Sequence, residues 1–474
     1  MRIKRVPEHP GAPARKAFVS ELRIIIRHAL TVLVGQMAVM AFGVTDTIVA
    51  GRYSETSLAA LSVGSAIYIS VYVALMGVMQ ALLPIWAEQH GARRLPDVGR
   101  SLRQSLYLCA IAILVGIAAL LSPDAVLRWT EIPVALQGEV QRYLAVLALA
   151  LAPSLLFRIY STLNQSLGKP QLVTWLQIGS LFIKVPLSIW FAFGGLGLAP
   201  QGLVGCAWAT LIVNYAMLAL ALWLLRSQDF YAPYRIWQRL ERPDWKRIAE
   251  FARLGIPGGL AILVEITSFT LMALFIARQG TTAAASHQIA ANLAAVLYMM
   301  PLSIAIATSA RVSYWLGAGD PRRARAVIHM GFKLAALMAV VLSIILFVAR
   351  QGIATIYARD PAVIALASAL LAWVAAYHLA DAVQTVCVFV LRCYRVTVLP
   401  LLVYCVLLWG LGLTGGYLLA YHGVGSLPAI ASPVTFWGTS AVALALTATI
   451  FAAILWTVQR PVPPPAPAPQ RTAS

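Results

Sequence analysis

Long apolar stretches constrain this chain more than any other feature of its sequence. Twelve of them are each long enough for a membrane-crossing helix, which needs about 20 mostly apolar residues. The chain has 474 residues, 60% apolar and only 11% charged, so it lacks the polar surface that soluble domains of this length require. The sequence therefore predicts an all-α polytopic membrane protein and excludes a soluble enzyme. The predicted spans are Ile24–Gly51, Leu58–Ala87, Leu102–Leu121, Ala135–Leu163, Leu172–Phe193, Leu203–Leu225, Ile248–Ala277, Ala284–Leu316, Ala324–Val348, Val363–Leu391, Val398–Ala420 and Val434–Val458.

The basic residues are concentrated in every second connection between these spans. The net charge of +19 would suggest a nucleic-acid partner in a soluble protein. Here the cations cluster in residues 2–27, 93–103, 226–253 and 322–325, as expected for cytoplasmic loops. We therefore expect a multi-pass protein of a bacterial-type inner (plasma) membrane, with both termini in the cytoplasm. Its surroundings are the lipid bilayer, and no nucleic acid is expected to bind.

The two halves of the chain resemble each other at an offset of 226 residues. Leu58-Ala59-Ala60 aligns with Ala284-Ala285-Ser286, and Gly91-Ala92 aligns with Gly317-Ala318. Six spans separate the copies, which predicts two parallel six-helix repeats related by an axis along the membrane normal. The expected organisation is a basic cytoplasmic amino-terminal segment (1–23), a first lobe (24–226), a cytoplasmic linker (227–246), a second lobe (247–458) and a disordered Pro-rich tail (459–474).

Three acidic residues lie well inside predicted spans: Asp46, Glu265 and Asp381. An unpaired acid near the bilayer centre costs at least about 2.5–3.5 kcal/mol. One interpretation is structural, with each acid hydrogen-bonded to neighbouring helices. The other is functional, because two carboxylates in a poorly hydrated cavity hold a proton, a small cation or a cationic substrate, but seldom two of these together. Such exclusive occupancy is what an exchanger needs.

Two basic residues also lie within spans of the first half. Lys184 is at the middle of its span and too central to reach the membrane surface easily, whereas Arg158 is some three turns inside the fourth span. We expect Lys184 or Arg158 to pair with Asp46 and to neutralise it.

Three segments carry a resemblance to a known family. They are FGVTDTIVAG in span one, YHLADAVQTVCVFVLRCYR in span ten, and the long block ILVEITSFTLMALFIARQGTTAAASHQIAANLAAVLYMMPLSIAIATSARVSYWLG in spans seven and eight. With twelve spans in two halves, the chain resembles the NorM-like branch of the multidrug and toxic compound extrusion (MATE) family. The resemblance extends over about residues 24–458.

This resemblance implies a V-shaped bundle in which an N-lobe and a C-lobe of six helices each surround a central cavity. It also implies export of cationic, amphipathic compounds against inward Na+ or H+. The family's C-lobe cation site matches Glu265 and Asp381, which become the candidate Na+ ligands, together with Tyr298 and Tyr377. The N-lobe acid of the family matches Asp46.

One segment departs from the family pattern. The NorM-like branch often has asparagines near its N-lobe acid, in a pattern like NxPxN, where this chain reads FIKVPLSIW. Lys184 and Ser188 take those positions, and Thr210 of the same pocket is retained. An ammonium where an amide would ligate a cation argues against Na+ binding in the N-lobe. We therefore expect coupling at the C-lobe acids.

The leading hypothesis is a secondary antiporter that acts on small cationic organic substrates, needs no cofactor, uses Na+ or H+ as coupling ion and functions as a monomer. An alternative is a flippase for lipid-linked oligosaccharides or other lipid-like substrates, whose anionic headgroups Arg158 and Lys184 could attract. A polytopic membrane enzyme is disfavoured because no nucleophile motif, phosphate-binding glycine loop or metal-ligand spacing is present.

Overall fold

Twelve helical spans form one antiparallel bundle in the computed structural model, which describes residues 14–123, 134–195, 197–425 and 428–459. Within these ranges each span is long and apolar enough to cross a membrane. The predicted fold class is therefore confirmed. The helices are α1 (Ala14–Tyr53), α2 (Glu55–Gln80), α3 (Leu83–Gly91), α4 (Leu95–Leu121), α6 (Val134–Ser166), α7 (Pro170–Phe193), α8 (Gly202–Ser227), η1 (Asp229–Tyr234), α9 (Trp245–Ala277), α10 (Thr281–Gly317), α11 (Pro321–Tyr357), α12 (Pro361–Cys393), α13 (Val398–Tyr404), η2 (Cys405–Thr414), α14 (Gly415–Tyr421) and α15 (Pro433–Val458).

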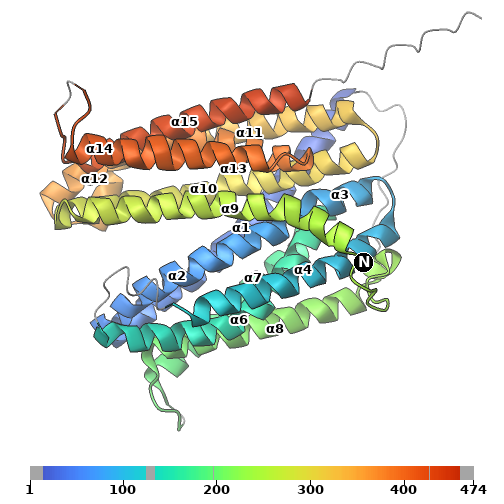
Figure 1. Cartoon of the computed structure of the whole chain (residues 1–474), viewed down its shortest axis with the longest axis horizontal. Helices are drawn as coiled ribbons and strands as arrows, with labels where there is room; N and C mark the ends of the chain where they lie inside the picture. The colour runs from blue at the N-terminus through green and yellow to red at the C-terminus, as the bar shows by residue number, and fades with distance from the viewer. Residues whose placement is uncertain (1–13, 124–133, 196, 426–427, 460–474) are drawn as a thin grey trace, which may run out of the picture.

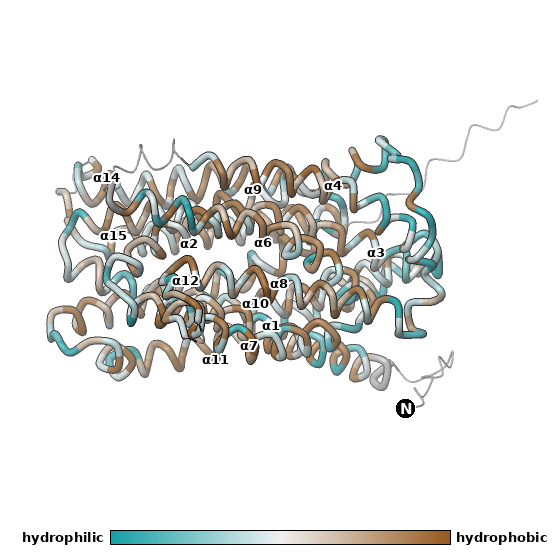
Figure 2. Tube along the Cα trace, turned by 90° about the horizontal axis from the view of Figure 1, so that it is seen from below, coloured by the Kyte–Doolittle hydropathy of each residue, from teal (hydrophilic) through white to brown (hydrophobic). Residues whose placement is uncertain are grey.

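The helices are arranged in two lobes. We call α1–α8 the N-lobe and α9–α15 the C-lobe. Figure 1 shows α2, α4, α6, α7 and α8 in blue to green below the yellow-green to red C-lobe, with the two layers close together at the end where α3 reaches the level of the C-lobe and apart at the other end. The closed end contains residues 92–94, 228–244 and 318–320; we call it the basic end. Apolar residues dominate the middle of the bundle and hydrophilic ones gather at its ends (Figure 2), as expected for helices that cross a bilayer.

Two glycines allow α3 of the N-lobe and α10 of the C-lobe to touch at the basic end. A Cβ on Gly91 would collide with the carbonyl oxygen of Tyr314, and one on Gly317 would collide with that of Glu88. The two contacts are equivalent, because Glu88 and Gly91 align with Tyr314 and Gly317 at the offset of 226 residues. Only glycine permits so close an approach of two backbones.

Ion pairs reinforce this inter-lobe contact. Arg311 of α10 donates to both carboxylate oxygens of Glu21 in α1, at 3.0 and 2.5 Å. Arg395, which follows α12, donates to Glu88 of α3 at 2.7 Å. The first pair is mostly buried and the second is more exposed, so the first contributes more to holding the lobes together.

The connection between the lobes is held against α4. Arg103 is almost fully buried and donates to the carbonyl of Arg235 at 2.7 Å and to the carboxylate of Glu241 at 2.8 Å. Desolvation alone would raise the pKa of Glu241, but the hydrogen bond and charge of Arg103 hold it below its ordinary value. The segment expected to be the cytoplasmic linker (227–246) therefore packs on α4 of the N-lobe.

The structure differs from the predicted spans at several places. The second predicted span is broken between Gln80 and Leu83, because Pro84 in the first turn of α3 cannot donate a backbone hydrogen bond to α2. The eleventh passes through a π-helix, η2, which contains two glycines. Helix α1 begins at Ala14, inside the predicted amino-terminal segment (1–23). Apart from Gln459, the predicted Pro-rich tail lies outside the described residues.

Replacement of Gly317 by alanine should force the lobes apart at the basic end. The new Cβ would overlap the backbone of Glu88, and overpacking of this kind costs about 1–3 kcal/mol. We expect a lower melting temperature in detergent and a longer distance between spin labels placed on α3 and α10.

The matched control is Gly352→Ala, since nothing lies within 4 Å of a Cβ at this glycine of α11. Alanine is the better helix former, so stability should be kept or raised there. Equal stability and equal label distances in both variants would contradict the proposed role of the glycine contact.

Candidate functional site

Two acidic residues and two tyrosines gather in the interior of the C-lobe. Glu265 lies in α9, Tyr298 in α10, and both Tyr377 and Asp381 in α12. Tyr377 and Asp381 are four residues apart and so share a face of α12. Each of the two tyrosines interacts electrostatically with both acids, and Glu265 with Asp381. The four C-lobe residues singled out from the sequence therefore form one cluster, here called the C-lobe site.

Asp381 is held in place by its own helix. Its side chain is buried, and its Oδ1 accepts hydrogen bonds from Gln384 at 3.0 Å and Thr385 at 3.5 Å. Gln384 is fixed in turn, because its amide oxygen accepts from the hydroxyl of Tyr404. This network orients the carboxylate of Asp381, whereas Glu265 is only half-buried.

An aromatic cluster fixes Tyr377 beside Asp381. The ring of Tyr377 contacts Phe269 of α9 and Trp437 of α15 edge-on, with centroids 5.8 and 5.9 Å apart. The indole nitrogen of Trp437 donates to the Nδ1 of His287 in α10 at 3.2 Å. Contacts from α9 and α15, with α15 held in turn by α10, therefore fix the position of the Tyr377 ring and its hydroxyl. His287 therefore takes part in packing α10 against α15.

Several residues at the C-lobe site were missed at the level of sequence. Gln384 and Thr385 could have been found, since positions three and four after Asp381 share its helix face. Arg392 also lies on this face, three helical turns further on, and interacts electrostatically with Glu265. Tyr404 could not have been found from the sequence, because it belongs to α13, and only the tertiary fold brings α13 to this site.

The N-lobe acid is neutralised directly by a lysine. The ammonium of Lys184 in α7 donates to the Oδ1 of Asp46 in α1 at 2.7 Å, to the hydroxyl of Thr210 at 2.7 Å and to the carbonyl of Cys206 at 3.0 Å. Ser188 donates to the same carboxylate oxygen at 3.3 Å. All three protons of the ammonium thus have an acceptor, and Lys184 is fully buried.

Arg158 is not part of this ion pair. Its Nη2 instead contacts the sulfur of Met76 in α2, and no hydrogen bond or ion pair joins it to Asp46 in the described part of the chain. Of the two partners expected for Asp46, the structure selects Lys184. Arg158 is buried in the N-lobe but takes no part in the neutralisation of Asp46.

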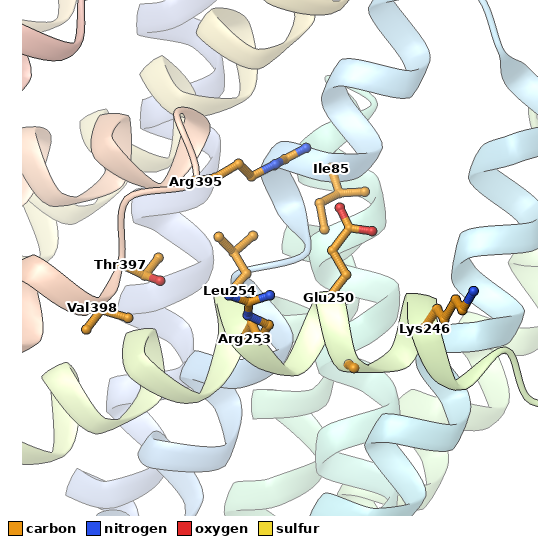
Figure 3. A pocket seen from close by; sticks show the side chains of 9 residues that line it. Ile85, Lys246, Glu250, Arg253, Leu254, Arg395, Thr397 and Val398 are labelled. Atoms are coloured by element: carbon orange, nitrogen blue, oxygen red, sulfur yellow. The ribbon is translucent and has the colours of Figure 1, made fainter.

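A separate cavity of about 400 Å³ lies at the basic end. Figure 3 shows Lys246, Glu250 and Leu254 on one helix, α9, facing Arg395 on the segment that follows α12. Neither acid of the C-lobe site lines this cavity. It belongs to the closed inter-lobe contact and is distinct from the candidate site.

Comparison with known proteins identifies the family. A profile of the MatE family matches residues 32–190 and 257–418, which is more than half of the chain. The chain belongs to the MATE family. A probable multidrug resistance protein NorM of Aromatoleum aromaticum is 37% identical and covers 92% of this chain and 94% of its own length. The multidrug resistance protein PmpM of Pseudomonas aeruginosa is 32% identical over 84% of both chains.

Solved structures of MATE proteins share this fold. The eukaryotic MATE transporter AtDTX14 has a TM-score of 0.82 at 17% identity and covers 93% of this chain and 98% of its own. The Vibrio cholerae MATE transporter VcmN, in its bent form, has a TM-score of 0.81 at 15% identity and covers 94% of this chain and 98% of its own. At sequence identities this low, the structural similarity establishes that this chain shares the fold of these transporters.

Removal of Lys184 should destabilise the protein more than removal of the whole ion pair. Lys184→Met leaves a buried, uncompensated carboxylate, which costs about 3–5 kcal/mol. In Asp46→Asn/Lys184→Met neither charge remains, so part of this loss should be recovered. Thermal and denaturant unfolding in detergent measure both effects.

Lys333→Met serves as control. Lys333 is an exposed lysine of α11, so its replacement should hardly change the free energy of unfolding. If the double variant unfolds as readily as Lys184→Met, the ion pair does not account for the cost.

Proposed function

We propose that this MATE protein is a secondary antiporter that exports cationic, amphipathic drugs or toxic compounds in exchange for inward Na+ or H+. Relatives that the chain matches over most of its length are named multidrug resistance proteins, among them MdtK of Pectobacterium atrosepticum at 31% identity. With twelve spans and bacterial relatives of this kind, the protein is a multi-pass protein of the inner membrane. Its termini face the cytoplasm, where the basic loops belong.

The observation that carries this proposal is the C-lobe site itself. Two carboxylates share an apolar interior with two tyrosines, and Asp381 is held by its neighbours in a fixed orientation. Carboxylate and hydroxyl oxygens suit a small hard cation, and the same carboxylates can bind a proton instead. An organic cation is attracted by the same negative charge. Occupation by one therefore weakens occupation by the other, and this competition couples the two fluxes.

The arrangement of the lobes supports alternating access. They touch at the basic end through Gly91 and Gly317 and diverge towards the opposite end (Figure 1). In this state the C-lobe site takes up a coupling ion from outside, and the bound organic cation leaves. The lobes then rock about their contact so that the site faces the cytoplasm, where the coupling ion dissociates. The membrane potential favours inward movement of the coupling cation by about 2.3 kcal/mol per charge per 100 mV and opposes outward movement of a monovalent organic cation by the same amount, so the concentration gradient of the coupling ion drives a one-for-one exchange.

The flippase alternative loses its main support in this structure. Arg158 and Lys184 were the residues that could attract an anionic headgroup. Lys184 is fully buried and all its donors are used by Asp46, Thr210 and the backbone. Arg158 is also buried, against Met76. Neither side chain presents a free positive charge to a lipid-like substrate.

Asp381→Asn should reduce cation-driven ethidium efflux to background, a loss of at least about tenfold that corresponds to about 1.4 kcal/mol. The amide keeps the size of the side chain but removes the charge that attracts the coupling ion. Proteoliposomes with imposed Na+ and pH gradients, applied separately, measure the loss and also identify the ion. We expect Glu265→Gln to behave in the same way.

Gly352→Ala is the control for purification and reconstitution. It is a small change far from either acid in sequence, and this variant should transport at the wild-type rate. Full activity of Asp381→Asn, with the variant inserted at wild-type levels, would overturn the assignment of coupling to the C-lobe site.

A further inference from the structure

A buried arginine lies next to the C-lobe site without an ion-pair partner of its own. Arg392 is 3% exposed, and its Nη1 has no hydrogen-bond partner in the described part of the chain. The guanidinium stacks over the ring of Phe389 at 4.6 Å and lies 3.8 Å from the position of a Cβ on Gly258. A charge buried in this way requires compensation by an opposite charge nearby.

The compensating charge comes from Glu265, the acid of the C-lobe site with which Arg392 interacts electrostatically. Gly258 and Glu265 are seven residues apart on α9, about two helical turns, so the guanidinium packs against the helix face that carries Glu265. On α12, Arg392 and Asp381 lie on one stripe but are eleven residues apart, about 16 Å along the helix axis, so Asp381 is the more distant of the two acids. Arg392 interacts electrostatically with Glu265 and with Tyr298 and Tyr404.

The two lobes compensate their acids in different ways. In the N-lobe the ammonium of Lys184 sits on Asp46 at 2.7 Å, so lysine and acid cancel and the oxygen ligands are occupied. In the C-lobe no ion pair within 4.0 Å joins Arg392 to an acid among the described residues. The guanidinium therefore reduces the net charge of the site without binding a carboxylate directly, so that a cationic ligand can still approach the acids.

We infer that Arg392 is the fixed counter-charge of the C-lobe site and sets its capacity to one monovalent cation. Two carboxylates and one guanidinium leave a single net negative charge. One Na+ or H+ neutralises it, and so does one monovalent organic cation. This inference rests on the proposed antiport, and adds that the exchange is one for one and moves no net charge across the membrane.

The test measures the ethidium gradient at which net flux stops, in proteoliposomes with a fixed gradient of the coupling ion. For wild type, a membrane potential of about 100 mV imposed with valinomycin and K+ should leave this gradient unchanged. Arg392→Met gives the site two net negative charges, so two coupling ions should exchange for one ethidium. One charge then crosses per turnover, and the same potential should shift the balancing gradient about 50-fold.

A double variant separates charge from structure. Glu265→Gln/Arg392→Met restores one net negative charge, so it should transport with the potential-independent balance of wild type. Glu265→Gln alone leaves no net charge and should lose cation coupling. Arg392→Lys keeps the charge and should keep the wild-type balance. Arg392→Met alone could fail to fold or transport. Recovery of coupled transport in the double variant would still support the inference, because removal of an acid can compensate for a lost positive charge but not for lost packing of the arginine side chain.

Arg103→Met is the matched control, since it removes a buried guanidinium that binds the linker and not the site. Even if little of this variant is recovered, the ethidium gradient at which its net flux stops should not depend on the membrane potential. A potential-dependent balance in wild type, a potential-independent one in Arg392→Met, or an inactive double variant would each overturn the role of Arg392. Absence of any cation-driven efflux by wild type would instead refute the proposed function.

Discussion

The cost of a charged side chain in a low-dielectric interior governs this protein. In water a carboxylate needs no partner, but inside the bilayer an isolated one costs several kcal/mol. The three embedded acids each meet this requirement. Asp46 has an ammonium in direct contact, Glu265 has the guanidinium of Arg392 at longer range, and Asp381 accepts hydrogen bonds from an amide and a hydroxyl group. The acid of the N-lobe is therefore neutralised by a direct ion pair, whereas the acids of the C-lobe have no cation in direct contact among the described residues.

The same pseudo-symmetric frame produces two different lobes. The internal repeat gives equivalent backbone contacts at the basic end, where Gly91 meets α10 and Gly317 meets α3. Such contacts depend on the absence of a side chain and tolerate no change on either copy. The polar residues inside the lobes do not follow the repeat, because one lobe contains a lysine–aspartate ion pair and the other two acids with two tyrosines. The contact between the lobes is symmetric, while the chemistry inside them is not.

The sequence singled out residues that the structure brings together, but not their partners. Glu265 and Asp381 stood out because acids are rare inside spans, and all four residues of the C-lobe site, with Tyr298 and Tyr377, match the motifs of the family. The sequence left both Lys184 and Arg158 open as partners of Asp46, because depth along a helix says nothing about the direction in which a side chain points. Tyr404 was missed because it enters the C-lobe site from a span whose contacts cannot be inferred from its own residues.

The sequence by itself determined the class of the protein, the number of spans, the repeat and the presence of buried charge. These follow from hydropathy, length and charge, which are local properties of the chain. Only the tertiary structure decided which charges meet, where helices bend and how the two lobes touch. Those features depend on the direction of side chains across helix–helix interfaces, and distances in space between residues such as Arg392 and Glu265 are not encoded in their separation along the chain.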